Sequence, residues 1–386
     1  MEILRSSELS VQSFDIARVD LDFYTPMHLP FGILAGRPSG WVTIHAKAGG
    51  IETVGQGEGA TLPEPLFTDD SGHNIVENST ELLEQLSSTQ DMNFGEALNH
   101  IWSYTFKNGG RYPTARLAVE MSLIDAVAKA NDLSVGQMIG LPEEVREVAY
   151  GKSIGAETAE TIVAQAREAI ANRSSKIKIK VSPNITDDVI RAIRELRSSF
   201  PQVEYMVDAN GTFDPGNEYD IAKLKELDSL DLSVIEEPVS RAGKVKGLKA
   251  VKLLLRQMNF RTPICLDDCL ETLEQTNEVV IDGTAQVVNI KPGRIGSFVK
   301  SLDLIDKVSQ LGGQVMIGGM FEATPGRCMT AILGAYCALK GSDIPGDLSL
   351  AQERLTEDLV PPSMQLQYSP SGNIMLPKGK GWGFSE

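Results

Sequence analysis

Acidic side chains follow three short apolar runs of the sequence at nearly regular intervals. Asp208, Glu236 and Asp267 end these runs, with spacings of 28 and 31 residues. If the runs are strands of one parallel sheet, the three carboxylates lie together at its carboxyl edge. Carboxylates in a site of low dielectric repel one another, and a hard cation such as Mg²⁺ relieves that repulsion. A single acidic strand end is usually a helix N-cap or a solvated loop residue, but three in succession favour a metal site.

Lysines flank these carboxylates along the chain. Lys176, Lys178 and Lys180 alternate with apolar residues, so in a strand they share one face. A solvated edge strand would explain that pattern, but a strand inside a βα series is covered on both sides, which turns the lysines inward. Lys291 ends the run that follows Asp267, 24 residues further on. Two lysines beside a dication could remove a proton α to a carboxylate and return it on the other face.

Histidine chemistry is excluded from most of the chain. The four histidines lie within the first 100 of 386 residues. The last 286 residues therefore offer no histidine base, histidine metal ligand or Ser-His-Asp triad. The four cysteines are expected to be free thiols, because Cys265 and Cys269 have no second pair to complete a zinc site.

The overall composition limits the possible binding partners and the cellular location of the protein. The chain has 52 acidic and 36 basic residues, a formal net charge of −16, which argues against nucleic acid and anionic membranes as partners. The first residues do not resemble a signal peptide, and no run of 18 apolar residues could span a membrane. We therefore expect a cytoplasmic protein. We also expect a small-molecule carboxylate as its substrate and a homo-oligomeric state.

The first 140 residues are typical of an α+β unit. Strands are expected at 14–24, 40–48 and 51–57, with a proline-containing loop at 25–32 between the first two. Helices are expected at 81–86, behind an N-cap at 78–80, and at 114–131. The segment 55–59 has the glycine spacing of a phosphate loop, but it lacks the lysine and does not open a helix, so we predict a turn.

From about residue 145, short apolar runs alternate with amphipathic segments. The expected strands are 147–154, 176–181, 204–210, 232–239, 263–270, 285–292 and 314–320. The expected helices are 159–172, 187–198, 219–228, 246–257, 273–281 and 298–311. This alternation predicts a parallel sheet, either a (β/α) barrel or an open doubly wound sheet. The barrel is favoured because no glycine-rich phosphate loop follows the first strand.

These motifs together resemble a known family. They are Lys178-Ile179-Lys180, Asp208-Ala209-Asn210, Ile235-Glu236-Glu237-Pro238, Leu266-Asp267-Asp268, Asn289-Ile290-Lys291-Pro292-Gly293-Arg294 and Pro345-Gly346-Asp347. Their order and spacing resemble the enolase superfamily, muconate-lactonizing subgroup, and most of all the o-succinylbenzoate synthase / N-succinylamino acid racemase family. The resemblance implies a modified (β/α)7β TIM-type barrel at 141–355. It also implies an N-terminal capping domain at 1–140 and a tail at 356–386 that returns to the cap.

The resemblance also assigns roles to residues. It implies that Asp208, Glu236 and Asp267 bind Mg²⁺, with Mn²⁺ as a substitute, and that Lys180 and Lys291 are the acid/base pair. The expected substrate-binding residues are Lys178, Asn210, Gly319 and Met320. Asp268 stands where the family usually has a glutamate that reaches the second lysine, and its side chain is shorter.

The expected activity is Mg²⁺-dependent removal of a proton α to a carboxylate, through an enediolate. An N-acylamino acid racemase is the preferred interpretation, because lysines on both faces permit racemisation. The alternatives are an o-succinylbenzoate synthase, which dehydrates its substrate on the same site, or another cycloisomerase or epimerase of this type. A sugar-acid dehydratase is less expected without a barrel histidine, and a non-catalytic barrel that binds a metal and a carboxylate is the alternative from a different class.

Overall fold

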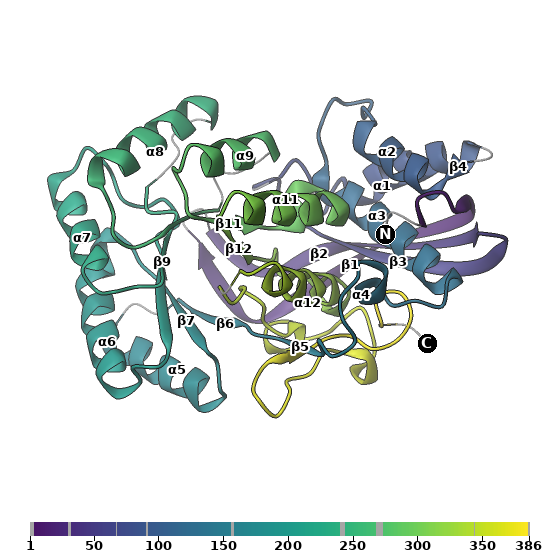
Figure 1. The fold of residues 1–386 in the computed structure, drawn as a ribbon. Helices are drawn as coiled ribbons and strands as arrows, with labels where there is room; N and C mark the ends of the chain where they lie inside the picture. Colours follow the sequence, from purple (N-terminus) through teal and green to yellow (C-terminus); the bar gives the residue numbers. More distant parts are fainter. Residues whose placement is uncertain are drawn as a thin grey trace.

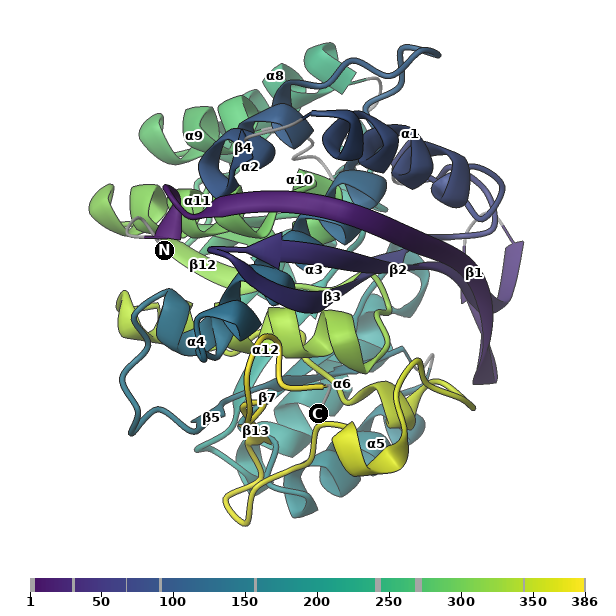
Figure 2. The ribbon, with the colours of Figure 1, turned by 90° about the vertical axis from the view of Figure 1, so that its right-hand side faces the viewer.

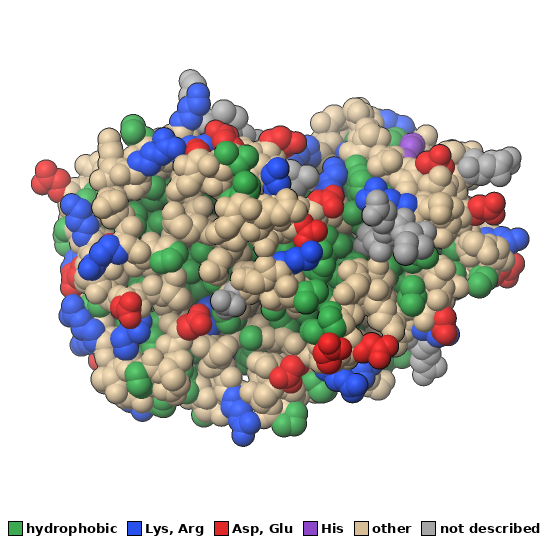
Figure 3. All heavy atoms as spheres, in the orientation of Figure 1, with side chains coloured by type: hydrophobic (Ala, Val, Ile, Leu, Met, Phe, Trp, Pro, Cys, Tyr) green, Lys and Arg blue, Asp and Glu red, His purple; other side chains and the backbone are tan. Residues whose placement is uncertain are grey.

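The computed structural model describes residues 4–29, 32–66, 68–89, 92–155, 158–239, 244–267, 273–342 and 344–384. It places an antiparallel sheet with helices beside a larger unit of parallel strands and helices (Figure 1). The predicted boundaries after residues 140 and 355 stay a prediction. None of the helices within the described ranges is both long and apolar enough to cross a membrane. On the face drawn in Figure 3, basic and acidic side chains are interspersed.

The N-terminal unit, called the cap here, is a four-stranded sheet covered by helices. Its strands have the order β3-β2-β1-β4. The strands are β1 (Glu8–Leu29), β2 (Gly32–Ala48), β3 (Ile51–Ala60) and β4 (Met92–Asn93). The helices are α1 (Ile75–Ser88), α2 (Phe94–Ser103), α3 (Pro113–Ala130) and α4 (Val135–Met138). Figure 2 looks onto the long, curved β1 and its neighbours β2 and β3.

Three expectations for the cap are wrong. The loop expected at 25–32 is largely strand: β1 continues to Leu29 with a register shift between Asp22 and Met27, and β2 begins at Gly32. Helix α1 begins at Ile75 rather than 81, so the residues expected to cap it lie inside its first turns. The segment 55–59 belongs to β3 and is not a turn.

The glycines of β3 explain how closely the sheet approaches α3. A Cβ atom on Gly55 would lie 2.0 Å from the carbonyl oxygen of Ser122 in α3, and one on Gly57 would lie 2.1 Å from that of Ala118. These positions admit no side chain, so the strand and the helix pack backbone to backbone. α3 is buried along most of its length as a result.

The larger unit is a parallel barrel. Its seven strands are hydrogen-bonded in chain order, from β6 to β12. They are β6 (Gly151–Ile154), β7 (Lys176–Lys180), β8 (Glu204–Asp208), β9 (Val234–Glu236), β10 (Ile264–Leu266), β11 (Val287–Ile290) and β12 (Gln314–Ile317). The sheet is closed by a short eighth segment, where Gly346 accepts from the Gly151 N–H at 2.8 Å and the Asp347 N–H donates to Ile317 at 2.9 Å. The fold is the modified (β/α)7β barrel that the sequence predicts.

The barrel helices cover the outside of this sheet (Figure 1). They are α5 (Ala159–Ala171), α6 (Thr186–Ser199), α7 (Glu218–Asp228), α8 (Lys244–Met258), α9 (Leu273–Ile281), α10 (Pro292–Ile295), α11 (Phe298–Gln310) and α12 (Thr324–Leu339). Short 3₁₀ turns lie at Pro183–Ile185, Ala351–Glu353 and Pro362–Met364. Helix α12 is not among the sequence predictions.

The strand expected at 147–154 is divided in two. β5 (Glu147–Val148) pairs with β13 (Ile374–Met375) of the C-terminal tail, and only β6 enters the barrel. Beyond β13 the tail reaches the cap, where the indole of Trp382 is buried against α3 and donates to the Met121 carbonyl at 2.9 Å. The tail therefore joins both units.

Candidate active site

The register of the barrel strands brings the predicted carboxylates side by side. Lys180 of β7 is paired with Asp208 of β8, and Asp208 is paired with Glu236 of β9. Asp267 follows the last residue of β10, the next strand. The barrel therefore gathers the three carboxylates at its carboxyl end, as expected for parallel strands.

An apolar layer underlies this group. It is a separate buried cluster of five inward-facing side chains, Met206, Val234, Cys265, Val287 and Met316. Charged groups above such a floor lie in a region of low dielectric, where they interact strongly. Their pairing therefore decides their charge states.

Lys180 and Asn210 lie together on one side of the site. The Lys180 ammonium lies 2.5 Å from Asp208 Oδ2 and donates to Asn210 Oδ1 at 2.9 Å. The side chain of Lys180 is 38% exposed whereas that of Asp208 is 2% exposed, so the lysine is open to a ligand. Burial would raise the pKa of Asp208, but Lys180 and Lys178 lower it below its usual value.

Lys291 and Arg294 hold Asp267 on the other side. Lys291 Nζ lies 2.5 Å from Asp267 Oδ2, and Arg294 Nη1 donates to Oδ1 at 2.9 Å. Burial would raise the pKa of Asp267, but Lys291 and Arg294 lower it well below its usual range. Lys291 and Arg294 therefore favour the ionised form of Asp267.

Lys178 lies between the carboxylates. Its ammonium is 2.9 Å from Glu236 Oε2 and 3.4 Å from Asp208 Oδ2, and it also donates to Asp347. Burial would lower the pKa of Lys178, but Asp347, Glu236 and Asp208 raise it well above its usual range. The predicted substrate-binding lysine thus lies among three carboxylates that favour its charged form.

Glu236 is the most perturbed acid of the group. Burial, together with the neighbouring charges of Asp208 and Asp267, raises its pKa to about 8, although Lys178 opposes this shift. Its second oxygen accepts from Asn289 Nδ2 at 2.9 Å. The part of the chain that the structure describes contains no preformed cluster of three acidic, histidine or cysteine ligands. In this structure Lys178 pairs with both Glu236 and Asp208.

Gly319 and Met320 follow β12 in the loop that leads to α12. A Cβ atom on Gly319 would lie 2.5 Å from Glu322 Oε2 and 2.6 Å from Arg327 Nη1, so a side chain at this position would displace this buried pair. The Met320 N–H donates to Glu322 Oε1 at 2.7 Å, and the Met320 side chain is largely buried. These residues line the same end of the barrel as Lys291, whereas Asp268 lies outside the described residues.

The structure adds three residues to the predicted site. Asn289 contacts Glu236, Arg294 contacts Asp267, and Asp347 contacts Lys178. Asn289 could have been found from the sequence, because it lies two residues before Lys291 on the same strand face. Arg294 and Asp347 belong to motifs noted in the sequence, but no local pattern indicates what they contact.

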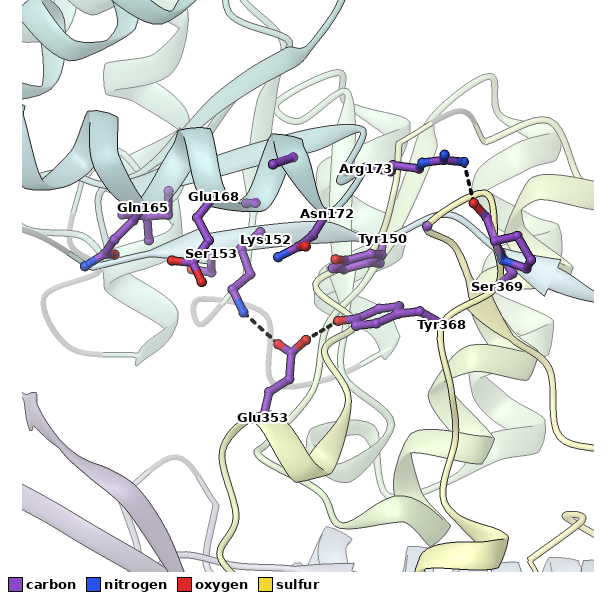
Figure 4. A pocket seen from close by; sticks show the side chains of 15 residues that line it. Tyr150, Lys152, Ser153, Gln165, Glu168, Asn172, Arg173, Glu353, Tyr368 and Ser369 are labelled. Carbon is purple, nitrogen blue, oxygen red and sulfur yellow. Dashed lines mark hydrogen bonds and ion pairs between the residues drawn. The ribbon is translucent and has the colours of Figure 1, made fainter.

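A cleft of about 750 Å³ lies outside the barrel, between β6, α5 and the C-terminal tail. Figure 4 shows Lys152 and Tyr368 converging on Glu353, with Tyr150 stacked on Tyr368 at a centroid distance of 5.0 Å. The predicted site residues are not part of this cleft. The acid/base and carboxylate groups therefore belong to the barrel end and not to this surface feature.

Comparisons with known proteins relate the chain to one family. A family model described as Enolase C-terminal domain-like matches residues 161–385. An o-succinylbenzoate synthase from Listeria innocua is 28% identical over 330 residues, which are 85% of this chain and 82% of that protein. An N-succinylamino acid racemase from Thermus thermophilus is 29% identical over 333 residues, or 85% of this chain and 83% of that protein.

Solved structures share the fold over nearly the whole chain. An enolase superfamily member from Listeria innocua aligns with a TM-score of 0.83 at 25% identity, over 98% of this chain and 95% of that one. The muconate lactonizing enzyme from Pseudomonas putida aligns with a TM-score of 0.79 at 19% identity, over 97% of both chains. The cap, the barrel and the tail thus have counterparts in known structures.

Proposed function

Because the chain belongs to the enolase superfamily, in its muconate-lactonizing subgroup, we propose that it racemises N-acylamino acids by removing and returning the α-proton. It is an enzyme related to both o-succinylbenzoate synthases and N-succinylamino acid racemases, an isomerase or a carbon-oxygen lyase. The observation that carries the proposal is the symmetry of the two lysines. β7 and β11 each lie two strands from β9, so Lys180 and Lys291 flank Glu236 from opposite sides.

The donor set fits a divalent cation. Asp208, Glu236 and Asp267 are buried oxygen ligands whose mutual repulsion contributes to the raised pKa of Glu236. Oxygen-only ligands favour Mg²⁺, and Mn²⁺ can take the same ligands. When bound by these residues, the cation would supply positive charge to offset the negative charge that develops on the substrate carboxylate during proton removal.

The two lysines would divide the proton transfers. For one enantiomer, neutral Lys180 Nζ takes the α-proton and the Lys291 ammonium returns a proton on the opposite face. For the other enantiomer the roles reverse. Lys178, on the same strand face as Lys180, would bind the substrate carboxylate, while Asn210 orients Lys180 through its 2.9 Å contact. The loop carrying Gly319 and Met320 would form the wall of the substrate site on the side of Lys291.

α-Proton exchange tests this proposal. In D₂O with Mg²⁺, both enantiomers of an N-acylamino acid should incorporate deuterium and interconvert, as followed by NMR and chiral chromatography. Lys180→Ala and Lys291→Ala should each slow interconversion by about 10²–10⁴-fold, the usual contribution of an acid/base group. Lys152→Ala, whose side chain pairs with Glu353 outside the barrel, is the control and should retain activity.

Each contrary result has a definite meaning. If either active-site lysine variant keeps full activity, its assigned role is wrong. If no carboxylate exchanges its α-proton, the enzymatic mechanism itself is wrong. Turnover of the cyclohexadiene precursor of o-succinylbenzoate, without exchange of N-acylamino acids, would replace racemisation by dehydration as the function.

We also propose a cytoplasmic location and a homo-oligomeric state. Cys265, Cys328 and Cys337 are buried free thiols in the described part of the chain, as expected for a reducing compartment. Light scattering coupled to gel filtration measures the oligomeric state, and a monomer at micromolar concentration would contradict that expectation.

A further inference from the structure

A fully buried ion pair of the cap also forms hydrogen bonds with backbone groups of the barrel. Arg37 of β2 and Glu58 of β3 have side chains that are 0% exposed, and Nη2 lies 2.5 Å from Oε1. Ser39 Oγ donates to the same carboxylate at 3.0 Å. A buried charge pair is costly unless its remaining hydrogen-bonding positions are filled.

Barrel groups fill those positions. The backbone N–H groups of Ala323 and Gly326 donate to the two oxygens of Glu58, each at 2.9 Å. These donors belong to the first turn of α12, whose N-cap residue Ala323 provides no side-chain cap. Glu58, a residue of the N-terminal unit, therefore provides the N-terminal capping carboxylate of a barrel helix. Its negative charge interacts favourably with the positive end of the helix dipole.

Arg37 also holds the loop that precedes this helix. Its Nε donates to the Phe321 carbonyl at 2.5 Å. Phe321 has a φ of +64°, a conformation that costs an L-residue roughly 1–2 kcal/mol. Its ring packs edge-on against Phe23 of β1 at 5.8 Å and lies under the Arg354 guanidinium, just before the tail, at 5.0 Å. Phe321 therefore contacts both the cap and the C-terminal part of the barrel unit.

The loop held in this way touches the side of the site that contains Lys291. A Cβ atom on Gly318 would lie 3.0 Å from Lys291 Cε and 2.4 Å from Asn289 Oδ1. A Cβ atom on Gly293 would lie 3.1 Å from the sulfur of Met320. β12, the strand that leads into this loop, is hydrogen-bonded to β11, the strand that precedes Lys291. The closing segment at Gly346 and strand β6 lie between β12 and β7, the strand of Lys180. A displacement of the loop should therefore disturb one lysine and spare the other.

We propose that Arg37 and Glu58 are positioning residues that hold residues 318–323 against Lys291 and so set the proton transfer on that face of the substrate. This inference rests on the two-lysine mechanism proposed above. Arg37 and Glu58 act through the loop, because their side chains are wholly buried in the cap and do not reach the reacting atoms.

Variants that retain only one of the two lysines measure α-proton exchange on each face of the substrate separately. Exchange that persists in Lys180→Ala runs through Lys291, and exchange that persists in Lys291→Ala runs through Lys180. Adding Glu58→Gln should slow Lys291-dependent exchange at least about fivefold, because a misplacement of the order of 1 Å can cost up to 10²-fold. It should leave Lys180-dependent exchange within about twofold of its parent. Arg37→Lys, which loses the fork that reaches Phe321, should act in the same direction.

Glu120→Gln is the matched control. Glu120 is also a buried carboxylate of the cap that caps a barrel helix, since it accepts from Ser297 Oγ at 3.0 Å and from the Val299 N–H at 2.9 Å. It should leave the ratio of the two exchange rates unchanged. If Glu58→Gln does not fold by circular dichroism, Ser39→Ala, which removes one donor to Glu58, makes the same comparison.

The outcomes are distinct. Equal loss on both faces, or the same effect from Glu120→Gln, overturns the positioning role and leaves Glu58 as a stability element. Absence of exchange in the parent single-lysine variants and in the wild type contradicts the proposed function instead. A selective loss on the Lys291 face supports the inference.

Discussion

A substitution of Asp347 tests how much this carboxylate stabilises the buried lysines of the barrel. Asp347 lies on the segment that closes the sheet and pairs with both Lys178 and Lys176, whose Nζ is 3.8 Å from Asp347 Oδ1. In Asp347→Asn, Lys178 keeps its contacts with Glu236 and Asp208. Lys176 is 0% exposed, and in the described part of the chain Asp347 is its one acidic partner within 4.0 Å. The substitution therefore leaves Lys176 as a buried ammonium without a counter-charge.

The expected loss of stability at pH 7 follows from the ion pair that is broken. Removing one partner of a buried ion pair typically costs about 3–5 kcal/mol. The part of this cost that falls on Lys176 cannot exceed that of deprotonating its ammonium, whose ordinary pKa is 10.5. At pH 7 that ceiling is about 5 kcal/mol, and at pH 9 it is about 2 kcal/mol, at 1.36 kcal/mol per pH unit. Because the unfolded chain then binds more protons than the folded variant, the variant gains stability relative to the wild type as pH rises from 7 to 9.

Urea unfolding followed by circular dichroism at pH 7 and pH 9 measures both effects. Glu353→Gln is the control, because its pair with Lys152, at 2.6 Å, has side chains that are 38% and 28% exposed. An exposed pair contributes less than about 1 kcal/mol. The reasoning is refuted if Asp347→Asn costs no more than this control, or if its cost grows with pH.

Three further predictions concern the cap, the thiols and the metal. Gly57→Ala, which would place Cβ 2.1 Å from a carbonyl oxygen of α3, should destabilise the protein by more than about 3 kcal/mol in urea unfolding. Gly136→Ala, whose Cβ meets nothing closer than 3.5 Å, should change stability by less than about 1 kcal/mol, and equal effects would contradict the packing argument. Cys328 and Cys337 should resist alkylation at pH 8 until the protein unfolds, because burial raises the pKa of both thiols. Peptide mapping measures this, and modification of the native protein would show that the thiols are accessible. Mg²⁺ at 100 times its dissociation constant should add about 2.7 kcal/mol of stability, and Glu236→Gln should weaken this effect in calorimetry, whereas an undiminished effect would place the ion elsewhere.

The sequence predicts those parts of the site that depend on strand alternation and spacing. The inward face of the lysine-rich strand and the carboxylates of the following strands need only a two-residue period and the common edge of a parallel sheet. The three residues Asp208, Glu236 and Lys180 are in register as a result. Their catalytic roles stay predictions until they are tested.

Helix α12 shows what local patterns miss. Its N-cap residue has no capping side chain, and the carboxylates that receive its first N–H groups are Glu58, 265 residues before Ala323, and Asp358, 34 residues after Thr324. A helix start that is stabilised by residues so distant in the sequence leaves no local capping signal. The extension of β1 past Pro26 is also missing from the sequence prediction. Proline and the register shift interrupt the alternation on which strand prediction depends.

The buried position of Trp382 has a consequence for biosynthesis. Its backbone N–H donates to Asp125 of α3 at 3.0 Å, and its ring contacts Phe298 at 5.0 Å. The cap is translated first, yet this part of its core is filled by a residue that follows α3 by about 250 positions. At roughly 5–20 residues per second, the ribosome needs about 12–50 s to supply it. During that interval the nascent cap exposes an apolar surface, so we expect it to depend on chaperones more than a domain whose core is complete within its own sequence.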